Sequence, residues 1–248
     1  QSSVPLDTLP FRLNPVLTVT DASLPFERRN ELVIVHLSQP VGPGETLSFS
    51  INYQGMLRVE SISDGVVEAS DFIDPRGVRL TPTANWYPVP ILSGPNMKYT
   101  QHDPAHIRLT VINSGSLPFA ANLPAVGENT FEANSASWVF LIGSPRLVVE
   151  QVGDITLITS RADLEQARGL ASVFEDPLRK ITPFFPDAKV QGLILMVLGE
   201  EGGLPGRTPP AAGYPLVVTP RYSPANMSAS LASSHRFVIK TLVTDLWS

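Results

Sequence analysis

The most regular alternation of hydrophobic and polar residues lies at positions 46–53. Its apolar members are Leu47, Phe49, Ile51 and Tyr53, and a polar residue precedes each of them. A period of two predicts a strand with one face on a core and the other in solvent. A Gly-Pro-Gly-Glu turn at 42–45 separates this stretch from another apolar run at 31–37. We therefore predict that 31–37 and 46–53 form an antiparallel pair.

Other short apolar runs follow at intervals along the first part of the chain. They predict strands at 17–20, 57–62, 107–112, 137–142 and 147–152. The chain has 24 prolines and 17 glycines, spread widely, which favours many short strands over long helices. We predict a mainly antiparallel β-sandwich or curved-sheet domain over residues 1–153.

The pattern changes after Gly153 and Asp154. Residues 155–159 predict a strand, and a helical stripe follows at three- and four-residue steps: Leu164, Ala167, Leu170, Phe174, Leu178, Ile181 and Phe185. Ser160 is the expected N-cap, with Asp163 as its capping-box partner. Pro177 lies inside the stripe, so we expect a kink or break near Glu175 and Asp176.

The last third of the chain completes a second predicted unit. Residues 190–198 form an apolar strand, a Gly/Pro-rich loop occupies 199–213, a short strand lies at 214–219 and a helix at 228–246. Residues 154–248 are thus predicted to be a small βαββα subdomain. The fold class is α+β.

Composition excludes several functions. The 248 residues carry 18 basic and 23 acidic side chains, a net charge of −5, without the basic footprint of a nucleic-acid-binding protein. No run of 18 apolar residues occurs, so any membrane contact is expected only through segments absent from this chain. The first residues show no signal-peptide pattern. Zero cysteines exclude disulfides, thiolate metal sites and cysteine nucleophiles.

The four histidines offer one metal-like spacing. His102 and His106 are four residues apart, as in zinc-binding helices. Pro104 between them disfavours a helix, and a predicted strand follows, so we interpret the pair as an exposed loop before that strand. His36 and His235 are interpreted as structural.

Other familiar site chemistry is missing from the sequence. The acidic residues Glu68, Asp71 and Asp74, and the pair Glu200 and Glu201, are interpreted as solvated loop charges. No nucleophile elbow, phosphate-binding loop or dinucleotide-binding motif occurs. The tryptophans are too dispersed to form an aromatic platform.

The order of several motifs resembles the gluzincin zinc aminopeptidases, the aminopeptidase N-like family. Pro43-Gly44-Glu45, the strand at 46–53 and Gly55 are similar to a signature of that family's N-terminal β domain. Trp86-Tyr87-Pro88 resembles its W-x-P turn. The stretch from 155 to 198, with Phe184-Phe185-Pro186, is similar to the start of its thermolysin-like domain. The resemblance implies that fold over nearly the whole chain.

The family's substrate-binding strand reads G-x-M-E-N-P. The comparable run here is Ala-Gly-Tyr-Pro-Leu-Val at 212–217. The resemblance places Gly213, which has no side chain, where the family has the glutamate that holds the substrate's free amino group. Tyr214 and Pro215 complete the altered motif.

The family's zinc helix reads H-E-x-x-H-x-W, and the comparable run here is 241–247, aligned by Trp247. Thr241 and Asp245 stand where the family has its two histidines, and Leu242 replaces the general base. Threonine and aspartate are a poor pair of zinc ligands, and leucine cannot accept a proton. The family's third ligand, a glutamate, would lie beyond Ser248.

We therefore predict a catalytically inactive, aminopeptidase-like pseudoenzyme with a binding or structural role and no zinc or other cofactor. Its partner is expected to be a protein or peptide of unknown identity. Its location is expected to be extracytoplasmic, periplasmic or at the cell surface, as part of a larger bacterial protein. One alternative is a fragment of an active zinc metallopeptidase whose catalytic half is missing. Another is a β-sandwich ligand-binding module.

Overall fold

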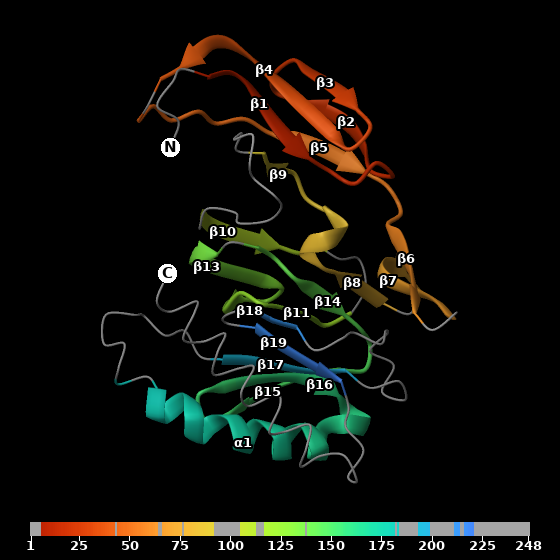
Figure 1. The fold of residues 1–248 in the computed structure, drawn as a ribbon, viewed down its shortest axis with the longest axis vertical. Helices are drawn as coiled ribbons and strands as arrows, with labels where there is room; N and C mark the ends of the chain where they lie inside the picture. The colour runs from red at the N-terminus through yellow and green to blue at the C-terminus, as the bar shows by residue number, and fades with distance from the viewer. Residues whose placement is uncertain are drawn as a thin grey trace.

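The structure, a computed structural model, describes residues 6–42, 44–63, 66–75, 77–91, 105–112, 117–136, 138–181, 183, 193–198, 211–213 and 216–220. Figure 1 shows antiparallel sheets in its upper and middle parts and a mixed sheet covered by one helix, α1, at the bottom. The described residues are mostly antiparallel β with a single α-helix.

The upper part holds two small sheets. The larger has the order β3 (Phe26–Arg29), β4 (Leu32–Val41), β1 (Leu6–Arg12) and β9 (Val89–Pro90). The other pairs β2 (Thr18–Ala22) with β5 (Ile51–Gln54). All of these pairs are antiparallel.

This pairing corrects one prediction. The strand at 31–37 does not pair with 46–53, because β1 and β3 occupy the two edges of β4. A two-residue link containing Asn30, in the left-handed region at φ 52°, folds β3 directly onto β4. The alternation itself is confirmed: from Leu47 to Tyr53 the apolar residues are half-buried and the polar ones exposed.

The middle part also holds two sheets. The five-stranded sheet has the order β11 (Phe119–Ala121), β14 (Leu141–Gly143), β8 (Gly77–Leu80), β7 (Val66–Asp74) and β6 (Arg58–Ser63). The three-stranded sheet has the order β10 (Ala105–Thr110), β13 (Thr130–Ala136) and β12 (Ala125–Gly127). A 3-10 turn, η1 (Pro82–Ala84), follows β8. The strand predicted at 137–142 is strand only at its end, in β14.

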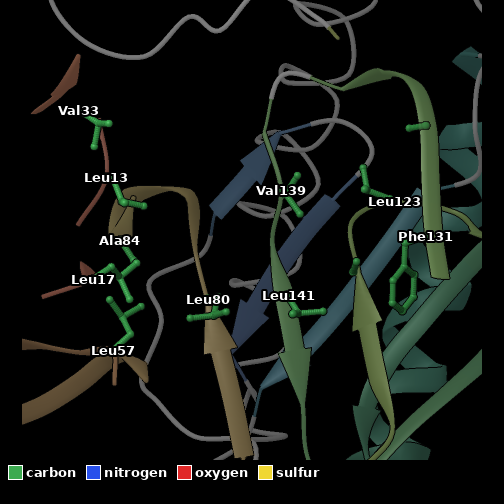
Figure 2. Close-up of a cluster of buried hydrophobic side chains, with 12 residues drawn as sticks. Leu13, Leu17, Val33, Leu57, Leu80, Ala84, Leu123, Phe131, Val139 and Leu141 are labelled. Atoms are coloured by element: carbon green, nitrogen blue, oxygen red, sulfur yellow. The ribbon is translucent and has the colours of Figure 1, made fainter. Parts of the chain in front are cut away.

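One hydrophobic cluster joins the upper and middle parts. Figure 2 shows labelled members extending from Val33 and Leu13 at one end to Leu123 and Phe131 at the other. Its buried members are Leu13, Leu17, Val33, Leu57, Leu80, Ala84, Ala121, Leu123, Phe131, Ala133, Val139 and Leu141. Burying each large aliphatic side chain contributes about 1.5–3 kcal/mol, so this cluster fixes how the sheets pack.

The lower part is a five-stranded mixed sheet. Its order is β15 (Leu147–Val152), β16 (Ile155–Ser160), β17 (Leu193–Leu198), β19 (Leu216–Pro220) and β18 (Ala211–Gly213). The three central strands are parallel, and the edge strands β15 and β18 are antiparallel to their neighbours. The strands predicted at 147–152 and 155–159 are confirmed. The helix predicted at 228–246 lies outside the described residues.

Helix α1 (Leu164–Ile181) follows the 3-10 turn η2 (Arg161–Asp163). The predicted cap is confirmed: the Ser160 hydroxyl accepts a hydrogen bond from the Asp163 N–H at 3.3 Å and donates one to its carboxylate at 2.7 Å. The helix continues through Pro177, so the predicted break is wrong, and the alternative of a kink stays a prediction. Leu170 and Phe174 are both buried, so packing of the apolar stripe outweighs the lost backbone bond.

Strand β14 separates two cores. Leu141 belongs to the cluster of Figure 2, whereas Ile142, on the opposite face, is fully buried in a second cluster. That cluster contains Ala120, Phe140, Ile142, Leu147, Ile158, Ile194 and Met196. The middle and lower parts thus share a core. The predicted domain boundary after residue 153 falls within the β15–β16 hairpin and stays a prediction.

Within the part of the chain that the structure describes, no helix combines the length and hydrophobicity that a membrane crossing requires.

Candidate functional site

The candidate site is the outer edge of β18. Among the described residues this strand has one neighbour, β19, which pairs Ala212 with Val217 and Gly213 with Leu216. In a hairpin closed by two residues, the flanking pair is hydrogen-bonded, so the next residue, Ala212, turns its N–H and C=O away from the partner strand. An edge of this kind can accept a further strand through its backbone.

The hairpin changes how the altered substrate-binding motif is understood. Gly213 ends β18, and the strand predicted at 214–219 begins instead at Leu216, as β19. The run 212–217 therefore spans a hairpin rather than one strand. The sequence at 211–213 is Ala-Ala-Gly, so a shift of one residue would still leave β18 without a carboxylate. The hairpin was missed, although a Gly-Tyr-Pro sequence before an apolar run is a turn signal.

The other predicted site residues cannot be compared with this edge. Tyr214, Pro215, Thr241, Leu242 and Asp245 lie outside the described residues. Their roles stay predictions.

The sheet behind β18 is held in register by a buried side chain. The Thr159 hydroxyl, at the end of β16, donates to the Val197 carbonyl of β17 at 3.2 Å, and Thr159 is fully buried. A satisfied hydroxyl at this depth fixes the two parallel strands relative to each other. β17 in turn pairs with β19, so the position of β18 depends on a rigid sheet.

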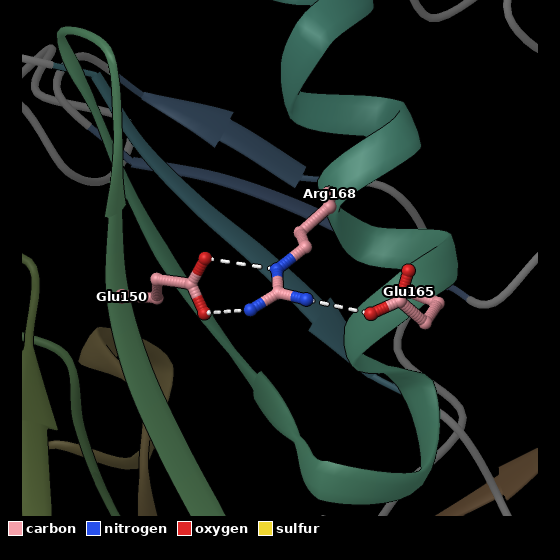
Figure 3. A network of polar contacts seen from close by, with 3 residues as sticks. All are labelled: Glu150, Glu165 and Arg168. Carbon is pink, nitrogen blue, oxygen red and sulfur yellow. Dashed lines mark hydrogen bonds and ion pairs between the residues drawn. The ribbon is translucent and has the colours of Figure 1, made fainter.

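An ionic network attaches α1 to the opposite edge of the sheet. Figure 3 shows Arg168 of α1 between Glu150 of β15 and Glu165 of its own helix. The guanidinium makes two bonds to Glu150, Nε–Oε1 at 2.9 Å and Nη2–Oε2 at 2.8 Å, and one to Glu165 at 2.6 Å. The bond from Arg168 lowers the pKa of Glu150, and the bond to Glu150 raises the pKa of Arg168.

The histidines do not assemble a metal site in the described residues. His106 lies on β10, not in the loop we predicted, and its Nε2 is 2.8 Å from Oε1 of Glu132, which also pairs with Arg108 at 3.2 Å. His36 lies on β4 and is exposed; His102 and His235 lie outside the described residues. Within those ranges no three His, Asp or Glu side chains gather closely enough to hold a metal ion.

One acidic residue is not the solvated charge we predicted. Asp71 on β7 is buried, and its carboxylate accepts a hydrogen bond from the backbone N–H of Thr81. The bond fixes the start of η1 relative to β7, so the role of Asp71 is structural.

The comparisons with known proteins identify structures with a similar fold. No protein-family model matches the chain, and a search of the curated proteins finds no match. Among solved structures, the M1 zinc metallopeptidase of Deinococcus radiodurans is 18% identical, with a TM-score of 0.52, over 87% of this chain and 53% of that one. A variant of it bound to a Tyr-Ser-Ala substrate has a TM-score of 0.53. A two-domain M1 zinc metallopeptidase variant bound to L-arginine is also 18% identical, with a TM-score of 0.53, over 92% and 56%.

The chain has the M1 zinc metallopeptidase fold. It spans about half the length of the M1 structures it matches. The likeness supports the predicted family fold, and it carries no information on whether the motifs of this chain are degenerate.

Proposed function

We propose that this chain is a catalytically inactive, M1-like domain that binds an extended peptide or protein segment along β18. The observation that carries the proposal is the position of β18 as an antiparallel edge strand on a mixed sheet of M1-like fold. An incoming strand would pair with the outward N–H and C=O of Ala212.

The sequence of the edge supports binding without aminopeptidase selectivity. In the resembled family a glutamate on this strand holds the free amino group, and residues 211–213 contain no acidic side chain. We therefore expect peptides with free and with acetylated N-termini to bind equally well. A site with an uncompensated carboxylate would prefer the free ammonium group.

The sequence of the predicted zinc helix supports inactivity. Thr241 and Asp245 do not supply two imidazoles, and Leu242 leaves the position of the family's general base without a proton acceptor. Without a metal to polarise a carbonyl and lower the pKa of a water, peptide hydrolysis by that mechanism has no nucleophile. The extracytoplasmic location rests on the resemblance alone and stays a prediction.

The first test measures metal and activity on protein purified without a metal-affinity tag. We expect no stoichiometric zinc by elemental analysis and no hydrolysis of Tyr-Ser-Ala above the buffer rate. Stoichiometric zinc with hydrolysis would contradict the proposal. It would favour the alternative that the chain is a fragment of an active zinc metallopeptidase, since the chain covers 53% of the M1 structure that it matches.

The second test measures peptide binding by isothermal titration calorimetry, with Tyr-Ser-Ala and its N-acetylated form. Ala212→Pro removes the outward N–H while leaving the inward bonds of Ala211 and Gly213 to β19, so binding should weaken by at least about tenfold. Val149→Pro, on the opposite edge strand of the same sheet, is the matched control and should bind normally. Equal loss in both variants, or a strong preference for the free amino group, would contradict the proposal.

A further inference from the structure

The edge strands of this molecule differ in how they are protected from pairing with other chains. Register shifts interrupt the ladders of β2 with β5, β6 with β7, β10 with β13, and β12 with β13. β9 and β11 have only two and three residues, and β3 has four, including Glu27, Arg28 and Arg29. Bulges, short strands and charged edges all discourage a further strand from pairing.

Strand β15 is neither bulged nor short, and its one charged residue, Glu150, is paired with Arg168 of α1. It has six residues, pairs with β16 in an unbroken register from Leu147 to Val152, and contains neither proline nor lysine. Among the edge strands of the described residues, it alone combines this length with a regular ladder. Its sequence, Leu-Val-Val-Glu-Gln-Val, is β-branched and mainly apolar.

The ladder with β16 shows which backbone groups of β15 face outward. The Arg161 N–H donates to the Arg146 carbonyl at 3.4 Å, which continues the ladder by one hydrogen-bonded pair. Such pairs alternate along an antiparallel ladder, so residues 148, 150 and 152 bond to β16. Val149 and Gln151 therefore turn their N–H and C=O away from β16, and Val149 is 51% exposed.

We propose that β15 pairs antiparallel with β15 of a second copy of this chain, about a two-fold axis at Val149. The two mixed sheets then become one continuous sheet, through an isologous interface. The exposed Val149 side chains meet at the axis, and Glu150 lies opposite Val148 of the other copy.

Charge disfavours one neighbouring register and favours a second copy as the occupant. Moving the axis to residue 150 makes the same kind of backbone bonds but sets Glu150 directly opposite Glu150, and like charges in that position are destabilising. Helix α1 runs alongside β15, since Arg168 bonds to Glu150 and Glu175 lies against Gly153. The axis at Val149 therefore brings Glu165, whose side chain is 88% exposed, toward Arg168 of the other copy, and the reverse. The acidic and basic side chains of the two copies of α1 are thus complementary across the two-fold axis.

Sedimentation velocity over a wide range of protein concentration tests the proposal. The unmodified chain should show a reversible monomer–dimer equilibrium, and Val149→Lys should weaken it by at least about tenfold, since two lysines would meet at the axis. Val16→Lys is the matched control, because Val16 is also 51% exposed but lies outside any edge strand. A monomer at every concentration, or a dimer that Val149→Lys leaves intact, would overturn the proposal.

The absence of cysteine allows a test of the register. Directly opposed residues in a hydrogen-bonded pair have Cα atoms about 5.5 Å apart, within the range that a disulfide bridges. Val149→Cys should therefore give a covalent dimer under mild oxidation, and Gln151→Cys should not. Covalent dimers from Gln151→Cys but not from Val149→Cys would overturn the axis at Val149. The peptide-binding test at Ala212 is independent of this outcome, since β18 is the opposite edge of the sheet.

Discussion

The antiparallel sheets of the upper and middle parts, the first region, differ from the mixed sheet in the regularity of their strand ladders. Within the described residues, five ladders of the first region contain a register shift, whereas none of the four ladders in the mixed sheet does. A bulge adds local twist and ends regular pairing, so the first region can close around its own core. The regular six-residue ladder leaves β15 able to accept a long strand, whereas the three residues of β18 suit only a short peptide segment. Binding is therefore expected at the mixed sheet, and scaffolding at the first region.

The two regions are nevertheless not energetically separate. The second hydrophobic cluster combines Ile142 of the first region with Ile158 and Ile194 of the mixed sheet. Because the core is shared, a substitution that destabilises one region should also destabilise the other. Three substitutions test this comparison, in order of decreasing effect.

Ile142→Ala should have the largest effect. Ile142 is fully buried where the regions meet, and truncating such a side chain costs about 2–5 kcal/mol in free energy of unfolding. Urea unfolding followed by far-UV circular dichroism and by tryptophan fluorescence measures the loss, and both signals should shift together. Ile112→Ala, at a residue that is 95% exposed, is the control and should change stability by less than about 0.5 kcal/mol. Two separated transitions in the Ile142 variant would show that the regions unfold independently.

Ser160→Ala should have an intermediate effect, confined to the mixed sheet and its helix. The substitution removes the N-cap acceptor for the Asp163 N–H and the donor to the Asp163 carboxylate, and lost caps cost about 0.5–2 kcal/mol. Hydrogen exchange should show the faster opening in α1 before any change in the first region. Ser172→Ala, on the exposed face of the same helix, is the control and should leave exchange unchanged. Equal loss of protection in both regions would contradict a local role for the cap.

The sequence predicted the strands better than it predicted their partners. Alternation from Leu47 to Tyr53 showed which side chains are buried, because burial depends on strand period alone. Pairing depends on turns: a single left-handed Asn30 gave β4 a different neighbour from the one predicted. In the same way, Pro177 indicated a break that the packing of Phe174 and its neighbours overrides.

The candidate site shows the same division. The resemblance placed Gly213 in the altered motif, but only the pairing of β18 with β19 showed that the backbone N–H and C=O of Ala212 point away from β19. The contact between Glu150 and Arg168 was also beyond sequence analysis, because the two residues meet only when α1 packs on β15. Tertiary contacts of this kind have no local periodicity to reveal them.

The Glu150–Arg168 contact gives the smallest and most condition-dependent prediction. The bond from Arg168 lowers the pKa of Glu150 in the folded chain, so the contribution of Glu150 to stability is fully present above its ordinary, unfolded pKa. This stabilisation is lost as the pH falls through the lower, folded pKa. Glu150→Gln should therefore destabilise the protein slightly at neutral pH, and the difference from the unmodified chain should vanish in acid. Because both side chains are partly exposed, high salt should also reduce this difference in stability.

Urea unfolding of both proteins at neutral and acid pH measures the difference, with Glu128→Gln, at an exposed turn residue, as the control. A difference that grows on acidification would show that Arg168 does not stabilise the ionised form of Glu150, and that α1 is attached to the edge of the mixed sheet by apolar packing alone.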